Sequence, residues 1–311
     1  MTADPTEPSP QAPLDVLVVG AGPGGLAAAT YLARFRRRVL VADGGEPRAG
    51  WIPVSHNMPG FPQGIAGKDI LARMREQAEE YGAVIQPVRV ERLTPDGDHF
   101  VADLAGRQLR ARAVVLATGV EDRLPPLPGL EDAIRRSLVR ICPICDGYEA
   151  TGKRVAVLGR DDMGVREAAF LRTFTRHVTL VHMGPPEALT ERRALEEMGA
   201  TLIEGPVEAV RLNGDHATAL CWGGQYRDFD FLYSALGTRP NAGLAETLGA
   251  ARAEDGRLTV DEHQRTSVKG LYACGDVVRG LNQIAVATAE AAVAATAIHN
   301  ALREADGWTV D

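Results

Sequence analysis

Short apolar runs that end at a glycine or an acidic residue recur along the chain and predict buried parallel strands. Residues 14–19 (LDVLVV) end at Gly20, and residues 39–42 (VLVA) end at Asp43. Neither run alternates with polar residues, which is typical of strands covered on both faces. Further strands are predicted by similar runs at 113–117, 154–158, 177–182, 229–236 and 270–276. The pattern therefore favours an α/β protein.

Helical and irregular segments separate these runs. Helical patterns are predicted at 26–33, 68–81, 165–173 and 283–300, and short strands within 84–103 around a Pro-Asp-Gly turn. The Gly- and Pro-rich segment 44–67 predicts a long loop that faces a ligand. Segments 124–129 and 237–241 predict linkers. Because the strand–turn–helix–strand order that begins at residue 14 begins again at 154, the chain contains two similar nucleotide-fold units.

Composition and charge narrow the class of protein. The 311 residues suggest about two domains. The net charge of −7 gives no attraction to phosphate backbones or anionic lipid, so we expect no nucleic-acid or membrane partner. Only four cysteines occur, which favours a reducing compartment. Residues 1–13 lack the pattern of a signal peptide and predict a disordered tail, and the alanine-rich run 284–298 is too short to span a bilayer. We expect a cytoplasmic protein.

The first glycine loop predicts a dinucleotide site. Gly20, Gly22 and Gly25 form a GxGxxG pattern between a strand and a helix. The first glycine allows the tight turn, the second lets the backbone approach a pyrophosphate, and the third permits close helix–strand packing. Asp43 ends the second strand about twenty residues later, where a ribose-binding acid belongs. The alternative is a glycine-rich turn with an unrelated surface aspartate.

Cys142 and Cys145 have the spacing of a redox pair. Two thiols separated by two residues can close as a disulfide and reopen as a dithiol, and the spacing lowers the pKa of one thiol. Asp146 follows directly and places a proton carrier beside the sulfurs. The same spacing supplies half of many zinc sites. No second CxxC or HxxxH occurs, and Cys221 and Cys274 stand alone, so we expect no metal.

The ordered set of motifs resembles the low-molecular-weight thioredoxin reductase family. The set comprises the glycine loop at 20–25, Ala-Thr-Gly at 117–119, the CxxC, the repeated unit, and Cys-Gly-Asp at 274–276. The resemblance covers residues 14–300. It implies two three-layer, Rossmann-like nucleotide-binding domains, the second inserted into the first: residues 14–123 and 244–311 would bind FAD, and residues 124–243 would carry the CxxC and bind NADPH. It also implies a homodimer that acts on a thioredoxin-like protein or on a small-molecule disulfide or dithiol.

The resemblance assigns a role to each matching residue. Cys145 would face the flavin, Cys142 would attack the substrate disulfide, and Asp146 would protonate the departing thiolate. Asp43 would bind the adenosine ribose, and Asp276 the ribityl chain. The implied FAD contacts are Gly20, Gly22, Gly24, Gly25, Asp43, Asn57, Thr118, Gly119, Gly275, Asp276, Gln283 and Ile284. The plainer interpretations are a strand-end cap for Asp276 and a turn former for Asn57.

The second nucleotide loop departs from the family pattern. It reads Gly-Arg-Asp-Asp-Met-Gly at 159–164, with Asp161 where the middle glycine should let the backbone approach a pyrophosphate. The arginine cluster expected for the NADPH 2′-phosphate is replaced by residues 182–186 (HMGPP), although Arg192 and Arg193 follow. An Arg-Gln pair expected before the last helix is replaced by Asn-Gln at 282–283. NADPH or NADH is therefore a doubtful electron donor.

Four alternatives stay open. Some relatives with a Cys-x-x-Cys-x-Gly-Tyr-Glu stretch oxidise a small-molecule dithiol with oxygen; residues 142–149 match, except that those relatives have His where this chain has Asp146. A ferredoxin-type electron donor would need no nucleotide loop. A non-catalytic flavin-binding redox sensor would bind FAD without turnover. A Rossmann protein without flavin would purify colourless.

Overall fold

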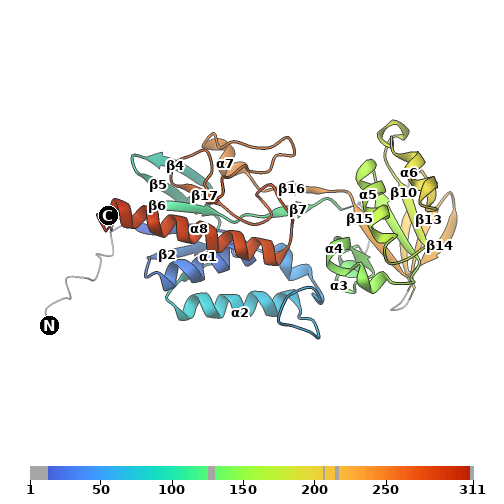
Figure 1. The fold of residues 1–311 in the computed structure, drawn as a ribbon, viewed down its shortest axis with the longest axis horizontal. Coiled ribbons are helices and arrows are strands. Elements are labelled where there is room, and N and C mark those ends of the chain that lie inside the picture. The colour runs from blue at the N-terminus through green and yellow to red at the C-terminus, as the bar shows by residue number, and fades with distance from the viewer. Residues whose placement is uncertain (1–12, 125–129, 206, 214–216, 309–311) are drawn as a thin grey trace. The chain divides into compact units, whose positions relative to one another are not determined.

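The computed structural model describes residues 13–124, 130–205, 207–213 and 217–308. It divides into two compact units, of which the first comprises Met1–Gly50, Lys68–Val120 and Pro240–Asp311 and the second comprises Trp51–Gly67 and Glu121–Arg239 (Figure 1). The expected tail at 1–13 and the expected linker at 124–129 lie almost wholly outside the described residues. Because the first unit is built from both ends of the chain, the second interrupts it.

The first unit is built on a seven-stranded sheet in the order β3-β2-β1-β6-β5-β4, with β17 also paired to β6. Pairing is parallel among β1, β2, β3, β6 and β17 and antiparallel in β4–β5–β6. The predicted first two strands coincide with β1 and β2. The strands are β1 (Leu14–Val19), β2 (Val39–Ala42), β3 (Val84–Gln86), β4 (Arg92–Asp96), β5 (His99–Leu104), β6 (Arg107–Leu116) and β17 (Leu271–Ala273).

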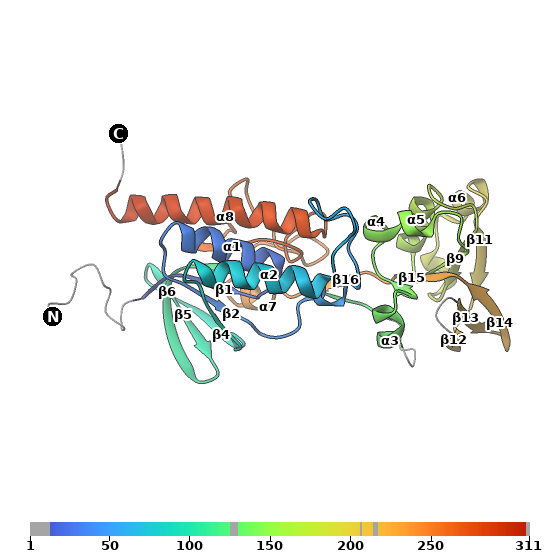
Figure 2. The same ribbon diagram turned by 90° about the horizontal axis from the view of Figure 1, so that it is seen from below.

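Side chains on the two faces of this sheet enter two separate cores. Val16 and Val18 of β1 pack with the helices α1 (Pro23–Arg34) and α8 (Ile284–Ala305), which run side by side in both views (Figures 1 and 2). Leu17 and Val19 point to the other face and pack with β4, β5 and the helix α7 (Gly243–Thr247). The helix α2 (Gly67–Glu80) adds Ala78 to the first core. The absence of alternation in β1 thus reflects burial on both faces.

The second unit contains a five-stranded parallel sheet and a three-stranded antiparallel sheet. The parallel sheet has the order β11-β10-β9-β15-β8, and the antiparallel sheet has the order β12-β13-β14. The strands are β8 (Val139–Arg140), β9 (Val155–Gly159), β10 (Val178–His182), β11 (Thr201–Glu204), β12 (Ala209–Asn213), β13 (Ala217–Trp222), β14 (Gln225–Phe229) and β15 (Phe231–Ala235). The parallel sheet contains the repeated nucleotide-fold unit predicted from residue 154.

Short helices complete the second unit. These are α3 (Leu130–Arg135), α4 (Pro143–Asp146), α5 (Asp162–Leu171) and α6 (Arg192–Glu197). The connections at its two ends, β7 (Val120–Asp122) and β16 (Thr238–Pro240), pair with each other. Two parallel-sheet units, one interrupting the other, confirm the predicted fold class.

Among the described residues, α8 is the one helix long and apolar enough to cross a membrane by length and composition alone. One face of α8 is buried in the core of the first unit, including Ala291, Ala294, Ala295 and Ile298. Packing in the core accounts for the apolar side chains on that face.

Candidate functional site

The first glycine loop is packed too tightly for side chains at two of its positions. A Cβ on Gly20 would lie 2.4 Å from the carbonyl oxygen of Ala117, and Gly20 also has a φ of +108°. A Cβ on Gly25 would lie 1.9 Å from the carbonyl oxygen of Gly20. The nearest atom to a Cβ on Gly22 would be 3.9 Å away, so the backbone is open to an approaching group there. Each glycine therefore has the surroundings that its predicted role requires.

Several predicted cofactor residues meet at the carboxyl ends of the strands of the first unit. A Cβ on Gly24 would lie 3.4 Å from Sγ of Cys274, at the end of β17. A Cβ on Gly275 would lie 3.4 Å from Cβ of Ala287, in the first turn of α8. The start of α1, the end of β17 and the start of α8 are therefore neighbours, as at the nucleotide crevice of an open α/β sheet.

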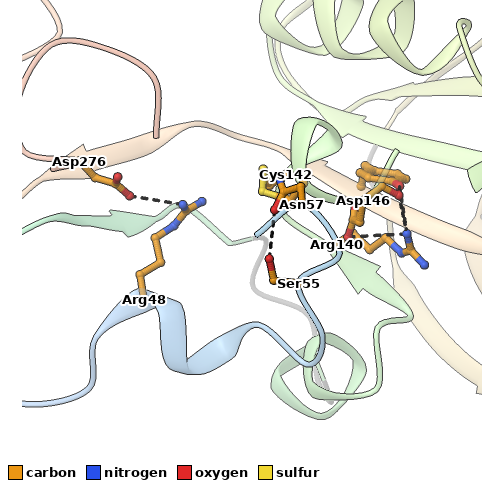
Figure 3. The surroundings of a disulfide bond; sticks show 9 residues. Arg48, Ser55, Asn57, Arg140, Cys142, Asp146 and Asp276 are labelled. Carbon is orange, nitrogen blue, oxygen red and sulfur yellow. Dashed lines mark hydrogen bonds and ion pairs between the residues drawn. A yellow bond between two sulfur atoms is a disulfide. The ribbon is translucent and has the colours of Figure 1, made fainter. Parts of the chain in front are cut away.

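The two acids that are predicted to bind the cofactor each form an ion pair with an arginine. No sequence pattern indicated either arginine. The carboxylate of Asp43 forms an ion pair with Arg75 of α2. The carboxylate of Asp276 lies 3.4 Å from Nη1 of Arg48 (Figure 3). The neighbouring Gly275 N–H donates to Oε2 of Glu290 at 2.7 Å, and burial raises the pKa of this glutamate. The arginines hold the two acids at the sheet edge.

The remaining predicted contacts occupy turns and a helix start. The Thr118 hydroxyl donates to the Asn241 carbonyl at 2.7 Å, and Gly119 has a φ of +65°. Gln283 is the N-cap of α8 without a side-chain capping bond, and Ile284 is the first residue of that helix. Asn57 lies in the segment that belongs to the second unit, where its Oδ1 accepts from the Ser55 hydroxyl at 3.0 Å (Figure 3).

The residues of the first unit fit a dinucleotide such as FAD. The N-cap of α1 is Gly22, which makes no side-chain capping bond. The N–H groups of the first turn of α1 therefore face the open loop. The loop lacks side chains where a pyrophosphate would lie, and α8 also begins without a side-chain cap. Two helix amino termini and an acid at the end of β2 form the donor and acceptor set that FAD needs.

Cys142 and Cys145 form a disulfide at the start of a one-turn helix in the second unit. Their Cα atoms are 5.3 Å apart, and Cys142 is the N-cap of α4. Both cysteines are partly exposed, and Ile144 between them is 48% exposed. Tyr148, just beyond the helix, is 78% exposed. The disulfide therefore lies at the surface of its unit with apolar side chains around it.

Asp146 lies against a buried cation. Nη1 of Arg140 is 3.6 Å from Oδ2 of Asp146 and donates to the Asp146 carbonyl at 2.8 Å (Figure 3). The Tyr233 hydroxyl donates to the same carbonyl at 3.2 Å. Burial raises the pKa of Asp146 to about 6, against the lowering effects of Arg140 and Tyr233, and Glu149 raises it further. Neither Arg140 nor Tyr233 was predicted from the sequence.

The second nucleotide loop is capped by its own side chains. Oδ1 of Asp161 accepts from the Met163 N–H at 2.8 Å and so caps α5. The carboxylate of Asp162 accepts from the N–H groups of Thr190 and Glu191 at 2.8 and 3.0 Å. One donor at the start of α5, the Met163 N–H, therefore already has a carboxylate acceptor where a nucleotide phosphate would otherwise lie.

The arginines after the second loop are paired with acids. Nη1 of Arg192 donates to Glu204 at 2.8 Å, and Nε of Arg193 donates to Glu197 at 2.7 Å. Both pairs are exposed, which agrees with a solvated helix face. In the part of the chain that the structure describes, no group of three or more His, Cys, Asp or Glu residues is placed to hold a metal ion.

Comparisons with known proteins agree with this architecture. The family model of the pyridine nucleotide-disulphide oxidoreductases matches residues 14–291. A thioredoxin reductase of Peptoclostridium litorale is 31% identical, over 93% of this chain and 97% of that protein. The crystal structure of thioredoxin reductase from Streptococcus pyogenes MGAS5005 matches with a TM-score of 0.85 at 27% identity, over 94% of this chain and 99% of that one. The crystal structure of HlmI matches with a TM-score of 0.86 at 32% identity, over 95% of this chain and 94% of that one.

The family model covers most of this chain. The relatives match this chain over nearly their whole length. The glycine loop and the disulfide lie within the matched residues. The chain therefore belongs to the pyridine nucleotide-disulphide oxidoreductase family and is a thioredoxin reductase-like, FAD-dependent disulfide oxidoreductase.

Proposed function

We propose that this protein moves two electrons between FAD and a disulfide or dithiol substrate through Cys142 and Cys145. The observation that carries the proposal is the partly exposed Cys142–Cys145 disulfide, followed directly in the chain by Asp146, whose carboxyl has a raised pKa. The glycine loop, Asp43, Asp276 and the start of α8 would hold FAD, which when bound would supply or accept the electron pair. In this role Thr118 and Gly119 would be further flavin contacts from the first unit, and Asn57 stays a predicted contact.

The two cysteines have different tasks in the exchange. In the reducing direction the Cys142 thiolate attacks one sulfur of the substrate, which forms a mixed disulfide and breaks the substrate S–S bond. The departing thiolate takes a proton from Asp146. The Cys145 thiolate then attacks Cys142, releases the second substrate thiolate and restores the Cys142–Cys145 disulfide. The pair loses two electrons and the substrate gains them, and the opposite sequence oxidises a dithiol.

The self-capped second loop bears on the electron donor. Because Asp161 bonds to the helix start and adds a negative charge there, a pyrophosphate would have to displace a carboxylate. We therefore propose that NADPH and NADH are poor donors. A dithiol that passes electrons through the flavin to oxygen, or a ferredoxin-type protein, would need no nucleotide loop. The self-capped loop fits a flavin-binding sensor without turnover equally well, and reduction of the flavin by a dithiol or by ferredoxin separates the enzymes from the sensor.

The substrate in this proposal is a thioredoxin-like protein or a small disulfide or dithiol. Ile144 and Tyr148 offer apolar contact area beside the disulfide, as a protein substrate would require. Thioredoxin reductases are among the relatives, and a cytoplasmic homodimer is the corresponding expectation.

One anaerobic experiment tests the proposal. The purified flavoprotein is mixed with NADPH, NADH, a small dithiol or reduced ferredoxin, and the flavin absorbance is followed. We expect bleaching by the dithiol or ferredoxin and slow or no bleaching by NADPH and NADH. Recovery on admitting air after dithiol reduction would select the oxidase. Fast bleaching by NADPH would contradict the interpretation of Asp161.

Variants separate the cysteine pair from the flavin. Cys142→Ser and Cys145→Ser are expected to retain FAD and to lose disulfide exchange. Cys221→Ser is the matched control, because this buried thiol lies on β13, outside the pair, and donates to Glu208. Disulfide reduction at full rate by the double variant of Cys142 and Cys145 would refute the proposed function.

A further inference from the structure

Arg140 is a buried cation, and the free-energy cost of burying its charge calls for an explanation. It ends the two-residue strand β8 and is 8% exposed. Its guanidinium lies 3.7 Å from the ring centroid of Phe231, on the neighbouring strand β15. Taking a guanidinium out of water costs several kcal/mol unless it is paired and hydrogen-bonded. The stacking contact offsets part of this cost, and the remainder falls to polar partners.

Nη1 of Arg140 faces the residue after the redox pair, whereas Nε donates to the Ser137 carbonyl at 3.4 Å. Its Nη1 donates to the Asp146 carbonyl at 2.8 Å and lies 3.6 Å from the Asp146 carboxylate. The same nitrogen lies 3.4 Å from the Tyr233 hydroxyl, which itself donates to the Asp146 carbonyl. One cation thus contacts both the backbone and the side chain of Asp146 (Figure 3).

The helix that carries Asp146 has little rigidity of its own. The helix α4 is a single turn of four residues and has no side-chain capping bond. Isolated helices of this length are unstable. The Cys142–Cys145 disulfide closes α4 in this structure. When the disulfide opens to the dithiol, donors from β8 and β15 still hold the Asp146 backbone beside the two sulfurs.

The charged and titratable groups around Asp146 shift the pKa of its carboxyl in opposite directions. Arg140 on β8 and Tyr233 on β15 lower the pKa of this carboxyl, while burial and Glu149, from the turn after α4, raise it. Oδ1 of Asp146 is buried and has no hydrogen-bond partner among the described residues. At a pKa of about 6 the carboxyl can both donate and accept a proton near neutral pH. Without Arg140 the carboxyl would stay protonated to higher pH.

We propose that Arg140 is a positioning residue for thiol–disulfide exchange, which holds Asp146 beside Cys145 and keeps its carboxyl able to exchange a proton near neutral pH. This inference rests on the proposed function, in which Asp146 protonates the departing thiolate. It assigns the buried guanidinium to the proton step and gives it no direct contact with the substrate.

The test compares two disulfides of different leaving groups. The flavoprotein is reduced anaerobically with dithionite, and its single-turnover exchange is measured from pH 5 to pH 9. One probe is 2-hydroxyethyl disulfide, whose departing thiolate needs a proton. The other is 5,5′-dithiobis(2-nitrobenzoate), whose departing thiolate is stable without one. Asp146→Asn identifies the limb of the pH profile that belongs to Asp146, because that limb should disappear.

We expect Arg140→Met to shift this limb upward by about 1 pH unit, the effect of losing an opposite charge at this distance. At pH values below the limb, where the Asp146 carboxyl is protonated in both proteins, its rate with 2-hydroxyethyl disulfide should fall about 10-fold, because a displaced carboxyl loses part of the 10²–10⁴-fold that a general acid contributes. Its rate with the aromatic disulfide should change little. Arg140→Lys should keep the limb near its original pH, because the positive charge remains. Arg136→Met, an exposed arginine of the neighbouring turn, is the control.

Retention of FAD and of the far-ultraviolet circular dichroism spectrum shows that each variant is folded. If Arg140→Met does not fold, Arg140→Gln, which also lacks the charge, takes its place. An unshifted limb together with equal rate losses on both disulfides would overturn the role of Arg140. Exchange that survives loss of both cysteines would instead refute the proposed function, so the two failures are distinguishable.

Discussion

Glu167 on α5 should make the stability of the protein depend on pH. Its Oε2 is buried and has no hydrogen-bond partner among the described residues. Burial, together with the negative charge of Asp122, raises the pKa of Glu167 from 4.5 to about 7. The folded state therefore binds a proton more tightly than the unfolded state. The stabilisation from this proton is complete below pH 4.5 and is lost as the pH rises toward 7.

The magnitude follows from the two pKa values. Because one pKa unit corresponds to about 1.4 kcal/mol, the loss between the two limits is about 3 kcal/mol. Glu167→Gln removes the titrating group but keeps a polar side chain of the same shape. We expect the stability of the variant relative to wild type to increase by about 2–3 kcal/mol between pH 5 and pH 8. That corresponds to roughly 10 °C in melting temperature.

Thermal unfolding of the FAD-loaded, disulfide-intact protein, followed by circular dichroism at several pH values, measures this difference. Subtracting wild type from variant at each pH cancels the contributions of all other titrating groups. Glu196→Gln is the matched control, since it makes the same change at an exposed position of α6. A difference between Glu167→Gln and wild type that stays constant from pH 5 to pH 8 would refute the reasoning.

Three further outcomes are expected. Gly25→Ala should prevent folding or FAD retention, because its Cβ would lie 1.9 Å from a carbonyl oxygen, whereas Gly22→Ala should fold and bind FAD more weakly; flavin content and melting temperature distinguish them. Tyr148→Ala should raise the KM for a protein disulfide several-fold and leave kcat nearly unchanged, as steady-state kinetics would reveal. Arg112 holds the pKa of Asp306 below its usual range, so Asp306→Asn should destabilise by about 1 kcal/mol or less above pH 4. This loss should shrink as the pH falls from about 4 through the lowered pKa of Asp306, as urea denaturation at two pH values would measure.

Parallel strands were predictable because burial on both faces leaves a continuous apolar run with a sharp end. The ends of β1 and β2 fall where Gly20 and Asp43 stop the run. The antiparallel sheet β12-β13-β14 was not predicted. Its strand β14 is largely exposed and reads QYRDF, so its hydrophobic pattern is too weak to indicate a strand. The strand β14 forms because it pairs with β13, and no local sequence pattern encodes this pairing.

The cysteine pair and the glycines were identifiable because their spacing alone carries the chemistry. Arg140 was not, since its partners Phe231 and Tyr233 follow about ninety residues later and meet it only when β8 pairs with β15. Asp161 was interpreted as an obstacle to a pyrophosphate. The structure adds that it is the N-cap of α5, a role that an Asp directly before a helical pattern also predicts.

The helices α1 and α5 start differently, and we therefore expect a bound nucleotide to stabilise the two units by different amounts. A unit whose helix start faces a bound phosphate gains RT ln(1 + [L]/Kd) of stability from that ligand. The helix α5 carries its own acceptor in Asp161, so we expect the second unit to gain less stability from a nucleotide. When flavin is scarce, we expect proteases to cleave the first unit faster than they do in the flavin-loaded protein. Flavin supply would then set the cellular lifetime of the enzyme.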